Sequence, residues 1–489
     1  MKVVIVFQLI LLFMNSTAFG ATWFVNNKTG NDGNDGQGDG KAFATFARTV
    51  KACKTSDKIV IANTGIPYRE RLSLVNLGGT PAKPFIIEGN GAVLSGFRAI
   101  QASEWKKAGE NLYFIELDMK WFYPSKSYFL CSDGKRIRRS TKASKAEGLK
   151  PGEWLPAKDG IYFKCDDGKT IDSCQITGVT LICALIMIRD SSYITCRNVV
   201  TEYSADDGID GFGDSRGLYF ENIESRNNGD QPVSFHDFSE ATVRNCWFHH
   251  NGTGIVDVNA SRTYYNGVLC EDNELTVAFN GGFHTMVDCV LRNNNGGVDI
   301  RALPITHLSG CEKSPIENTT VILKNVLITE TNRRAKGIVL QMEGVKNQVV
   351  MEHCVIEGCQ TAVWALLRKD PEDSFLHITS SAIINCENMI LNDNPASKFR
   401  FHGDYNVYCP AGVNWLGKKY PPAELENFLK TNGSDQESKI GVLSVKENGR
   451  LVDAAGLLTG KLQSVGLTYF LNEDEIFRGT MNKNVIDNK

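Results

Sequence analysis

The chain has 489 residues, of which 42% are hydrophobic and 22% charged, so it can bury a core and is not a disordered chain. Lys and Arg total 53 against 56 for Asp and Glu, which gives a formal net charge of −3. This balance lacks the clustered positive charge that attracts nucleic acids and anionic membrane surfaces, so we expect no nucleic-acid partner.

The first twenty residues have the pattern of an export signal. Lys2 supplies a positive charge, residues 3–14 form an apolar run, and Ala18-Phe19-Gly20 offers the small residues at which a signal peptidase cuts. The run is too short to cross a bilayer, and no later segment reaches the ~18 apolar residues of a membrane-spanning helix. We therefore predict a signal peptide at residues 1–20, a secreted or periplasmic location and no transmembrane segment.

Two different segments precede the regular part of the chain. Residues 21–98 are predicted to form an N-terminal cap and the first coils of a repeat, with a short capping helix near residues 43–53. Residues 99–182 lack the period that follows and carry paired strands, such as the one at residues 160–163. We interpret residues 99–182 as a β-rich insertion that lies against the repeat.

Short apolar strands recur through residues 183–394, which are predicted to form the regular coils. Five positions at steps of 24, 24, 22 and 21 residues are taken as equivalent: Asn198, Asn222, Cys246, Val268 and Cys289. A period of about 20–25 residues, with Asn- and Gly-rich turns and no helical pattern, predicts a solenoid of stacked β-coils. Inward residues of such coils form ladders, and Cys246, Cys289 and Cys354 are predicted to be buried free thiols in one ladder.

The period disappears in residues 395–489. One amphipathic helix is expected there, near residues 422–431. We predict that this last segment is a C-terminal cap, which closes the open end of the solenoid.

Several short motifs carry a family resemblance: Trp23-Phe24-Val25, Gly30-Asn31-Asp32-Gly33, the run at residues 42–46, the strand at residues 59–62 and Tyr68-Arg69-Glu70. In these motifs the chain resembles secreted proteins of the pectate-lyase-like superfamily, and the likeness extends loosely over residues 22–410. The resemblance implies an all-β, right-handed parallel β-helix and a function on extracellular polysaccharides. The lysine-plus-arginine motif of alginate and chondroitin lyases and the complete motif set of polygalacturonases are missing, so the resemblance leaves the reaction open.

Polar residues gather on one predicted outer face of the solenoid. The alignment places five residues in one inward column: Phe212, Phe235, Val258, Phe279 and Ile300. Because side chains of a strand alternate between faces, two outward rows follow. The first row contains Ser234, Asp257, Ala278 and Asp299, and the second contains His236, Asn259, Asn280 and Arg301. Further carboxylates lie near this face: Asp206, Asp207, Asp210, Asp214, Asp230 and Asp237.

Two reactions fit these residues. A glycoside hydrolase needs two neighbouring carboxylates, one protonated and one ionised, and the candidates for this pair are Asp207, Asp210, Asp230 and Asp257. A uronate lyase would use Asp257 and Asp299 to hold Ca²⁺, Arg301 to face the uronate and His236 as the base. Asn259, Asn280 and His284 are expected to contact the substrate in both cases.

The hydrolase is favoured because carboxylates outnumber basic residues on this face. Ca²⁺ is the only cofactor that the pattern suggests. The alternative function is a non-catalytic carbohydrate-binding or surface-adhesive solenoid, in which Asp and Asn occupy turns for conformational reasons alone.

Overall fold

The computed structural model describes residues 20–118, 129–132, 135–137, 139–140, 142–301, 318–330, 335–342, 346–368, 373–432, 437–446, 450–453 and 456–468. The predicted signal peptide, apart from Gly20, lies outside these residues. No helix within the described ranges is long and apolar enough to span a membrane.

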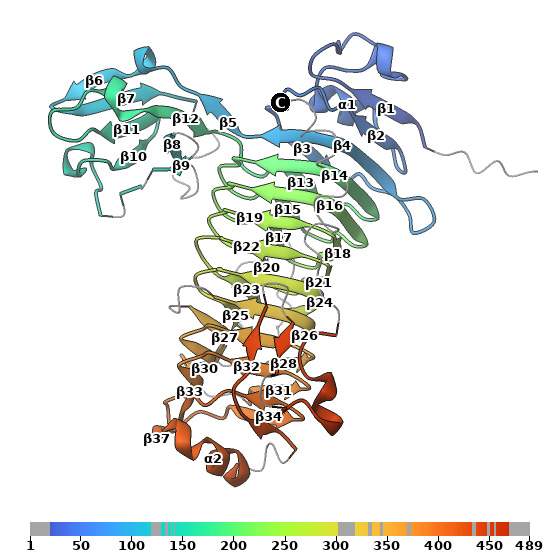
Figure 1. Ribbon diagram of the computed structural model, residues 1–489. Helices are drawn as coiled ribbons and strands as arrows, with labels where there is room; N and C mark the ends of the chain where they lie inside the picture. The colour runs from blue at the N-terminus through green and yellow to red at the C-terminus, as the bar shows by residue number, and fades with distance from the viewer. Residues whose placement is uncertain are drawn as a thin grey trace, which may run out of the picture.

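Short parallel strands stack coil upon coil into a β-helix (Figure 1). One sheet contains eighteen strands among the described residues: β1 (Thr22–Val25), β2 (Lys58–Ile61), β4 (Phe85–Ser95), β14 (Ile194–Glu202), β16 (Leu218–Arg226), β18 (Glu240–Arg244), β19 (Trp247–His249), β21 (Arg262–Asn266), β22 (Leu269–Glu271), β24 (Phe283–Arg292), β26 (Asn318–Thr329), β28 (Lys346–Glu352), β29 (Val355–Glu357), β31 (Phe375–Thr379), β32 (Ala382–Ile384), β34 (Arg400–Asp404), β35 (Val407–Tyr408) and β38 (Lys439–Ile440).

A second sheet forms another wall of the β-helix and carries the candidate site. Its twelve described strands are β3 (Leu72–Val75), β13 (Ile186–Arg189), β15 (Ile209–Phe212), β17 (Val233–Phe235), β20 (Val256–Val258), β23 (Val277–Asn280), β25 (Val298–Arg301), β27 (Lys336–Met342), β30 (Thr361–Leu367), β33 (Asn388–Asn392), β36 (Gly412–Trp415) and β37 (Lys418–Tyr420). All but the last pair are parallel. The periodicity therefore predicted the solenoid correctly.

Residues with positive φ form a sharp corner within each coil of the larger sheet. The corner residues include Asn198 (φ 58°), Asn222 (φ 54°), Asn245 (φ 51°) and Asp288 (φ 53°). Asn and Asp adopt this conformation at lower cost than other non-glycine residues, which explains their recurrence along the chain.

The cysteine ladder lies one residue after this corner. Cys246, Cys289 and Cys354 are fully buried free thiols, as predicted. Asn198 and Asn222 do not share their ladder, because both are corner residues, and Val199 pairs with Ile223 at the next position. That part of the predicted alignment is wrong by one residue.

The inward column of the second sheet also differs from the prediction at two coils. The register joins Leu74, Ile188, Gly211, Phe235, Asp257, Phe279, Ile300 and Leu340. Gly211 replaces Phe212 because the ring of Phe235 fills its place, and a Cβ added at Gly211 would lie 2.8 Å from Phe235 Cδ1. Asp257 replaces Val258, which moves an expected site residue into the interior.

The insertion projects from the N-terminal end of the β-helix (Figure 1) and forms two small antiparallel sheets. Its strands are β5 (Phe97–Ala99), β6 (Lys106–Gly109), β7 (Leu112–Glu116), β8 (Leu130–Ser132), β9 (Lys135–Arg136), β10 (Trp154–Ala157), β11 (Gly160–Lys164) and β12 (Ile176–Thr180). Trp105 and Trp154 are buried in its own apolar core. These two tryptophans are therefore packing residues.

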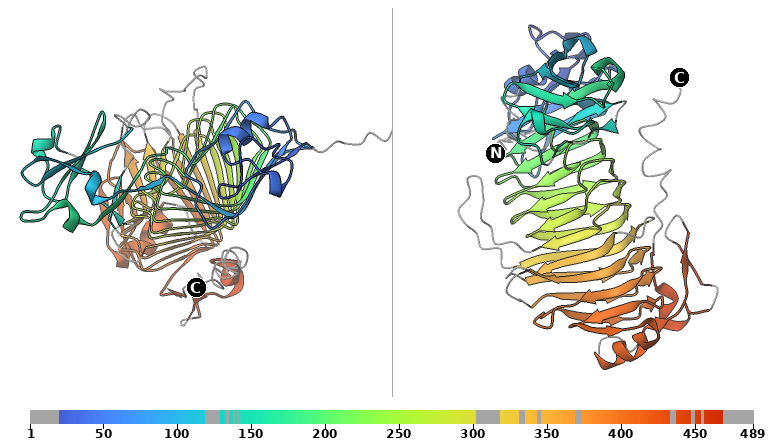
Figure 2. Two further views of the ribbon diagram at one scale, coloured as in Figure 1. Left: turned by 90° about the horizontal axis from the view of Figure 1, so that it is seen from above. Right: turned by 90° about the vertical axis from the view of Figure 1, so that its left-hand side faces the viewer.

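Both ends of the β-helix are covered. Helix α1 (Phe46–Ala52) begins at Thr45, whose side chain accepts a hydrogen bond from Arg48 N. Helix α2 (Leu425–Thr431) lies at the other end and matches the helix predicted near residues 422–431. Beyond β38, the described parts of residues 441–468 run back along the outside of the coils (Figure 2), and we call them the C-terminal strap. The short strands β39 (Ser444–Val445) and β40 (Leu451–Val452) belong to it.

Candidate active site

Four carboxylates and one histidine meet on the outer face of two neighbouring coils. Two of the carboxylates lie in equivalent turns, because Asp230 N donates to Asp206 O at 3.0 Å. Asp207 follows in the first turn, and its Oδ1 accepts from Gln231 N at 3.0 Å. One oxygen each of Asp206, Asp207 and Asp230 lie within 4.8 Å of one another. We call Asp206, Asp207, Asp210, Asp230 and His236 the carboxylate cluster.

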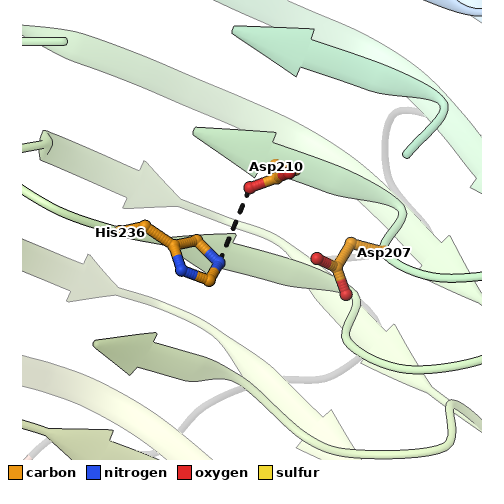
Figure 3. A group of neighbouring side chains, drawn as sticks. All are labelled: Asp207, Asp210 and His236. Carbon is orange, nitrogen blue, oxygen red and sulfur yellow. Dashed lines mark ion pairs between the residues drawn. The ribbon is translucent and has the colours of Figure 1, made fainter. Parts of the chain in front are cut away.

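Asp210 and His236 come from the strands of the same two coils (Figure 3). Asp210 lies in β15, and His236 directly follows β17, with its Nε2 3.6 Å from Asp210 Oδ1. Ser234 Oγ is 2.8 Å from the same Nε2 and donates its proton to Val256 O, so His236 Nε2 is the donor to Ser234. The proton on Nε2 therefore points toward Ser234, and Asp210 Oδ1 lies just beyond hydrogen-bond distance of the same nitrogen.

Burial raises the pKa values of three carboxyl groups in the cluster. The pKa of Asp210 rises to about 6, because burial outweighs the opposing charges of His236 and Arg71. The pKa of Asp207 rises well above its usual value through burial and the charges of Asp206, Asp210 and Asp230. Burial also raises the pKa of Asp230, although the hydroxyl of Thr253 bonds its Oδ1 at 2.7 Å and counteracts the shift.

The cluster offers ligand atoms in two overlapping sets. The first set is Asp206, Asp207 and Asp230, described above. The second set is one oxygen of Asp207, one oxygen of Asp210 and a ring nitrogen of His236, which also lie within 4.8 Å of one another. Carboxylate oxygens are ligands that Ca²⁺ accepts. The pair that we predicted for Ca²⁺, Asp257 and Asp299, does not form such a set among the described residues.

Asp257 is placed inside the β-helix and not on its outer face. It is 0% exposed, and its Oδ2 accepts hydrogen bonds from Thr263 Oγ1 at 2.7 Å and Tyr265 OH at 2.8 Å. His284 is also 0% exposed and lies 3.5 Å from Asp257 Oδ2. The expectation that Asp257 acts at the site and that His284 borders it is therefore wrong, because neither side chain reaches solvent.

Asp299 and Arg301 lie on the outer face but far from the carboxylate cluster. Asp299 follows Asp210 along the same row after four strand pairings, a separation of about 19 Å at 4.8 Å per strand. Arg301 Nη2 is 3.6 Å from Asp299 Oδ2, and Gln341 Nε2 donates to Asp299 at 2.6 Å. Asp299 and Arg301 therefore contact each other and Gln341, and this distance keeps them away from the carboxylate cluster.

The two asparagines expected to bind substrate lie on the coils that follow the carboxylate cluster. Asn259 lies in a turn with positive φ (64°) and donates to Asp237 Oδ1 at 3.1 Å. Asn280 ends β23 on the outer face and pairs with Val258 and Arg301. Of the predicted catalytic residues, the structure thus brings together Asp207, Asp210, Asp230 and His236.

Sequence reasoning missed two arginines near the cluster. Arg71, just before β3, donates to Ala184 O at 3.1 Å, and its charge lowers the pKa of Asp210. Arg136 of the insertion reaches the turn before Asp230 and lowers the pKa of that residue. Arg71 lies 139 residues before Asp210 in the chain, so only the fold brings the two charges together.

The geometry suits proton transfer to a bound ligand. Asp210 keeps 23% of its side chain exposed, while its buried Oδ1 has no hydrogen-bond partner among the described residues. With a pKa of about 6 it can hold or release a proton near neutral pH. A protonated acid beside ionised carboxylates is the arrangement used in glycoside hydrolysis.

Comparisons with known proteins agree with this fold. The family description "Right handed beta helix region" matches residues 153–302. The structure is similar to a complex of XylC with xylose, with 10% identity, a TM-score of 0.57 and 88% of each chain covered. It is also similar to a glycoside hydrolase, with 9% identity, a TM-score of 0.50 and coverage of 93% of this chain and 100% of the other. A search of curated proteins finds no match.

Proposed function

We propose that this chain, which has the right-handed parallel β-helix fold of the pectate-lyase-like superfamily, is a glycoside hydrolase that cleaves a polysaccharide outside the cell. The observation that carries the proposal is the carboxylate cluster, with four carboxyl groups on two adjacent coils and raised pKa values for three of them. The export pattern of residues 1–20 supports the extracellular location.

Asp210 is the general acid of this proposal. Its raised pKa keeps the carboxyl group partly protonated near pH 6, and the proton passes to the glycosidic oxygen as the bond to the anomeric carbon breaks. Asp206 and Asp230 occupy equivalent positions of adjacent coils and supply the ionised carboxylate that faces the anomeric carbon. Water completes the reaction by adding its hydroxyl group to that carbon and returning a proton to the cluster.

Asp207 and His236 support these groups. Asp207 is only 6% exposed and shares its surroundings with three other carboxylates, so it retains a proton and reduces their repulsion. His236 donates from Nε2 to Ser234, which holds the ring 3.6 Å from Asp210 Oδ1. The small exposed fraction of Asp207, 6% for the residue, makes it a poorer candidate for the acid than Asp210.

The test is a panel of polysaccharides with and without EDTA, in which new reducing ends and absorbance near 235 nm are both recorded. We expect reducing ends without absorbance, and a loss of about 100-fold or more in kcat for Asp210→Asn and Asp230→Asn. Activity should fall as pH rises through about 6, because Asp210 loses the proton that the leaving group needs.

Asp214→Asn is the matched control. Asp214 follows β15 on the same coil but is 61% exposed and paired with Arg216, so its loss should leave kcat unchanged. Unsaturated products that disappear with EDTA would instead establish a Ca²⁺-dependent lyase. Binding without any product would establish the carbohydrate-binding alternative.

A further inference from the structure

The β-rich insertion holds the turn that carries Asp206. Ala205, the preceding residue, is 0% exposed and belongs to the apolar core of the insertion, with Tyr203 packed against that core. Ala205 N donates to Ile182 O at 2.7 Å, and Ser204 Oγ donates to the same carbonyl at 3.0 Å. The first turn of the cluster is therefore fixed by packing and by hydrogen bonds.

The turn that carries Asp230 is held by one side chain of the insertion. Arg136 of β9 donates from its guanidinium to the carbonyl oxygens of Asn228 and Gly229, the two residues before Asp230. The same group donates to His250 O on the next coil at 3.1 Å. A rigid guanidinium with several N–H groups suits this task, because it can bond several fixed acceptors at once.

The coils are shaped to admit this guanidinium. Only 18% of the Arg136 side chain is exposed, and its Cζ lies 4.9 Å from the centre of the Phe129 ring. Gly252 leaves the necessary space, since a Cβ added there would lie 2.7 Å from Arg136 Nη1 and 2.1 Å from Gly229 O. Glu274 Oε1, at 3.7 Å, is the opposite charge nearby.

We propose that Arg136 is a positioning residue of the active site, which clamps the turn of Asp230 to the insertion and so orients the Asp230 carboxylate. The inference rests on the proposed hydrolase function, because it assigns Arg136 to the same cluster. The positive charge has a second effect, since it favours the ionised form of Asp230 against the neighbouring Asp206 and Asp207.

Three variants test the clamp. Arg136→Met removes the charge and the donors but keeps an unbranched stem over Phe129, and Arg136→Lys keeps the charge without the planar fork. Lys106→Met is the control, because it removes an exposed positive charge from the insertion that pairs with the exposed Glu116. Each full-length variant is examined by hydrogen exchange without substrate and by the pH dependence of kcat/KM.

For Arg136→Met we expect faster exchange of the amides of Gly229 and Asp230, by about 10- to 100-fold, because hydrogen bonds to a charged group are lost. We expect kcat to fall by about 10- to 100-fold as the carboxylate moves from its position. The acidic limb of kcat/KM should move up by about 0.5–1 pH unit, since Asp230 loses a stabilising positive charge. Arg136→Lys should restore the limb, and Lys106→Met should match the parent in all three measurements.

Hydrogen exchange separates failure of the clamp from failure of the proposed reaction. Unchanged exchange at Gly229 and Asp230 in Arg136→Met would overturn the clamp. Faster exchange with an unchanged kcat and pH profile would overturn the positioning role. Faster exchange in Arg136→Met, combined with a parent protein that cleaves no polysaccharide, would support the clamp. The same result would overturn the hydrolase function and, with it, the positioning role of Arg136.

Discussion

At the scale of single residues, burial moves the titration of a carboxyl group from acidic pH toward neutral pH. Asp210 is one case, and Glu330, directly after β26, is another. Glu330 is 4% exposed, and its Oε2 has no hydrogen-bond partner among the described residues. Burial raises the pKa of Glu330 from 4.5 to about 8. Unlike Asp210, Glu330 is remote from the carboxylate cluster, so its effect should appear in stability alone.

Glu330→Gln should therefore make the protein more stable at alkaline pH. Between pH 4.5 and about 8 the folded state keeps the proton that the unfolded state releases, so stability falls as pH rises through this window. We expect Glu330→Gln to raise Tm by roughly 2 °C or more at pH 8.5 and to have little effect at pH 4, measured by calorimetry. The exposed Glu387→Gln is the control and should show no such difference; equal pH dependence in both variants would contradict the assignment.

At the scale of elements, the repeat was predictable but the register of its shortest strands was not. Apolar periods and Asn corners show where coils begin, whereas β20 has only the three residues Val256–Val258. In a strand this short, either Asp257 or the two valines can face the interior. Hydrophobicity alone favours placing both valines inside. The structure buries Asp257 because partners from later strands satisfy it, and a short sequence window cannot show those partners.

The buried partners of Asp257 form a connected hydrogen-bond network that reaches His284. Thr263 donates its only hydroxyl proton to Asp257, so His284 Nδ1 must donate to Thr263 Oγ1, at 2.8 Å. His284 Nε2 lies 2.5 Å from Gly281 O. Thr263 thus links His284 and Asp257 in one buried hydrogen-bonded chain, with His284 Nδ1 3.5 Å from Asp257 Oδ2.

Asp257→Ala should therefore destabilise the fold without altering the chemistry of the site. Removing the Asp257 carboxylate leaves the buried hydroxyl groups of Thr263 and Tyr265 without their acceptor, which costs about 3–5 kcal/mol. We expect a lower urea midpoint with a normal kcat for the folded protein, and no change in either for Asp214→Asn. A kcat that falls while the urea midpoint is unchanged would return Asp257 to the active site, as first predicted.

At the scale of the whole molecule, each coil of the solenoid contacts mainly its neighbours. A destabilising substitution in one region should therefore leave distant coils folded. Strands β15 and β17, whose coils carry the carboxylate cluster, lie toward the insertion end of the column (Figure 1). The C-terminal strap packs on apolar residues of later coils. The strap is joined to those coils by hydrogen bonds such as Gly466 N to Ser380 O at 2.9 Å and Thr468 N to Asn325 Oδ1 at 2.7 Å. Loss of periodicity predicted a C-terminal cap but not this return along the outside, because the contacts join residues up to 143 positions apart.

Two adjacent strap residues provide a direct test of this independence. Leu443 is 1% exposed and belongs to the apolar cluster under the strap, whereas Val442 is 69% exposed. Leu443→Asp places a charge in that cluster at a cost of about 2–4 kcal/mol, so limited proteolysis should cut the strap earlier and Tm should fall. Val442→Asp should behave like the parent in both measurements. Because the cluster of Asp210 shares no contact with the strap among the described residues, both variants should keep the parent's kcat at temperatures below the transition. A kcat that falls in Leu443→Asp alone, with amides of the β15 and β17 coils exchanging faster, would show that the column responds as one cooperative unit.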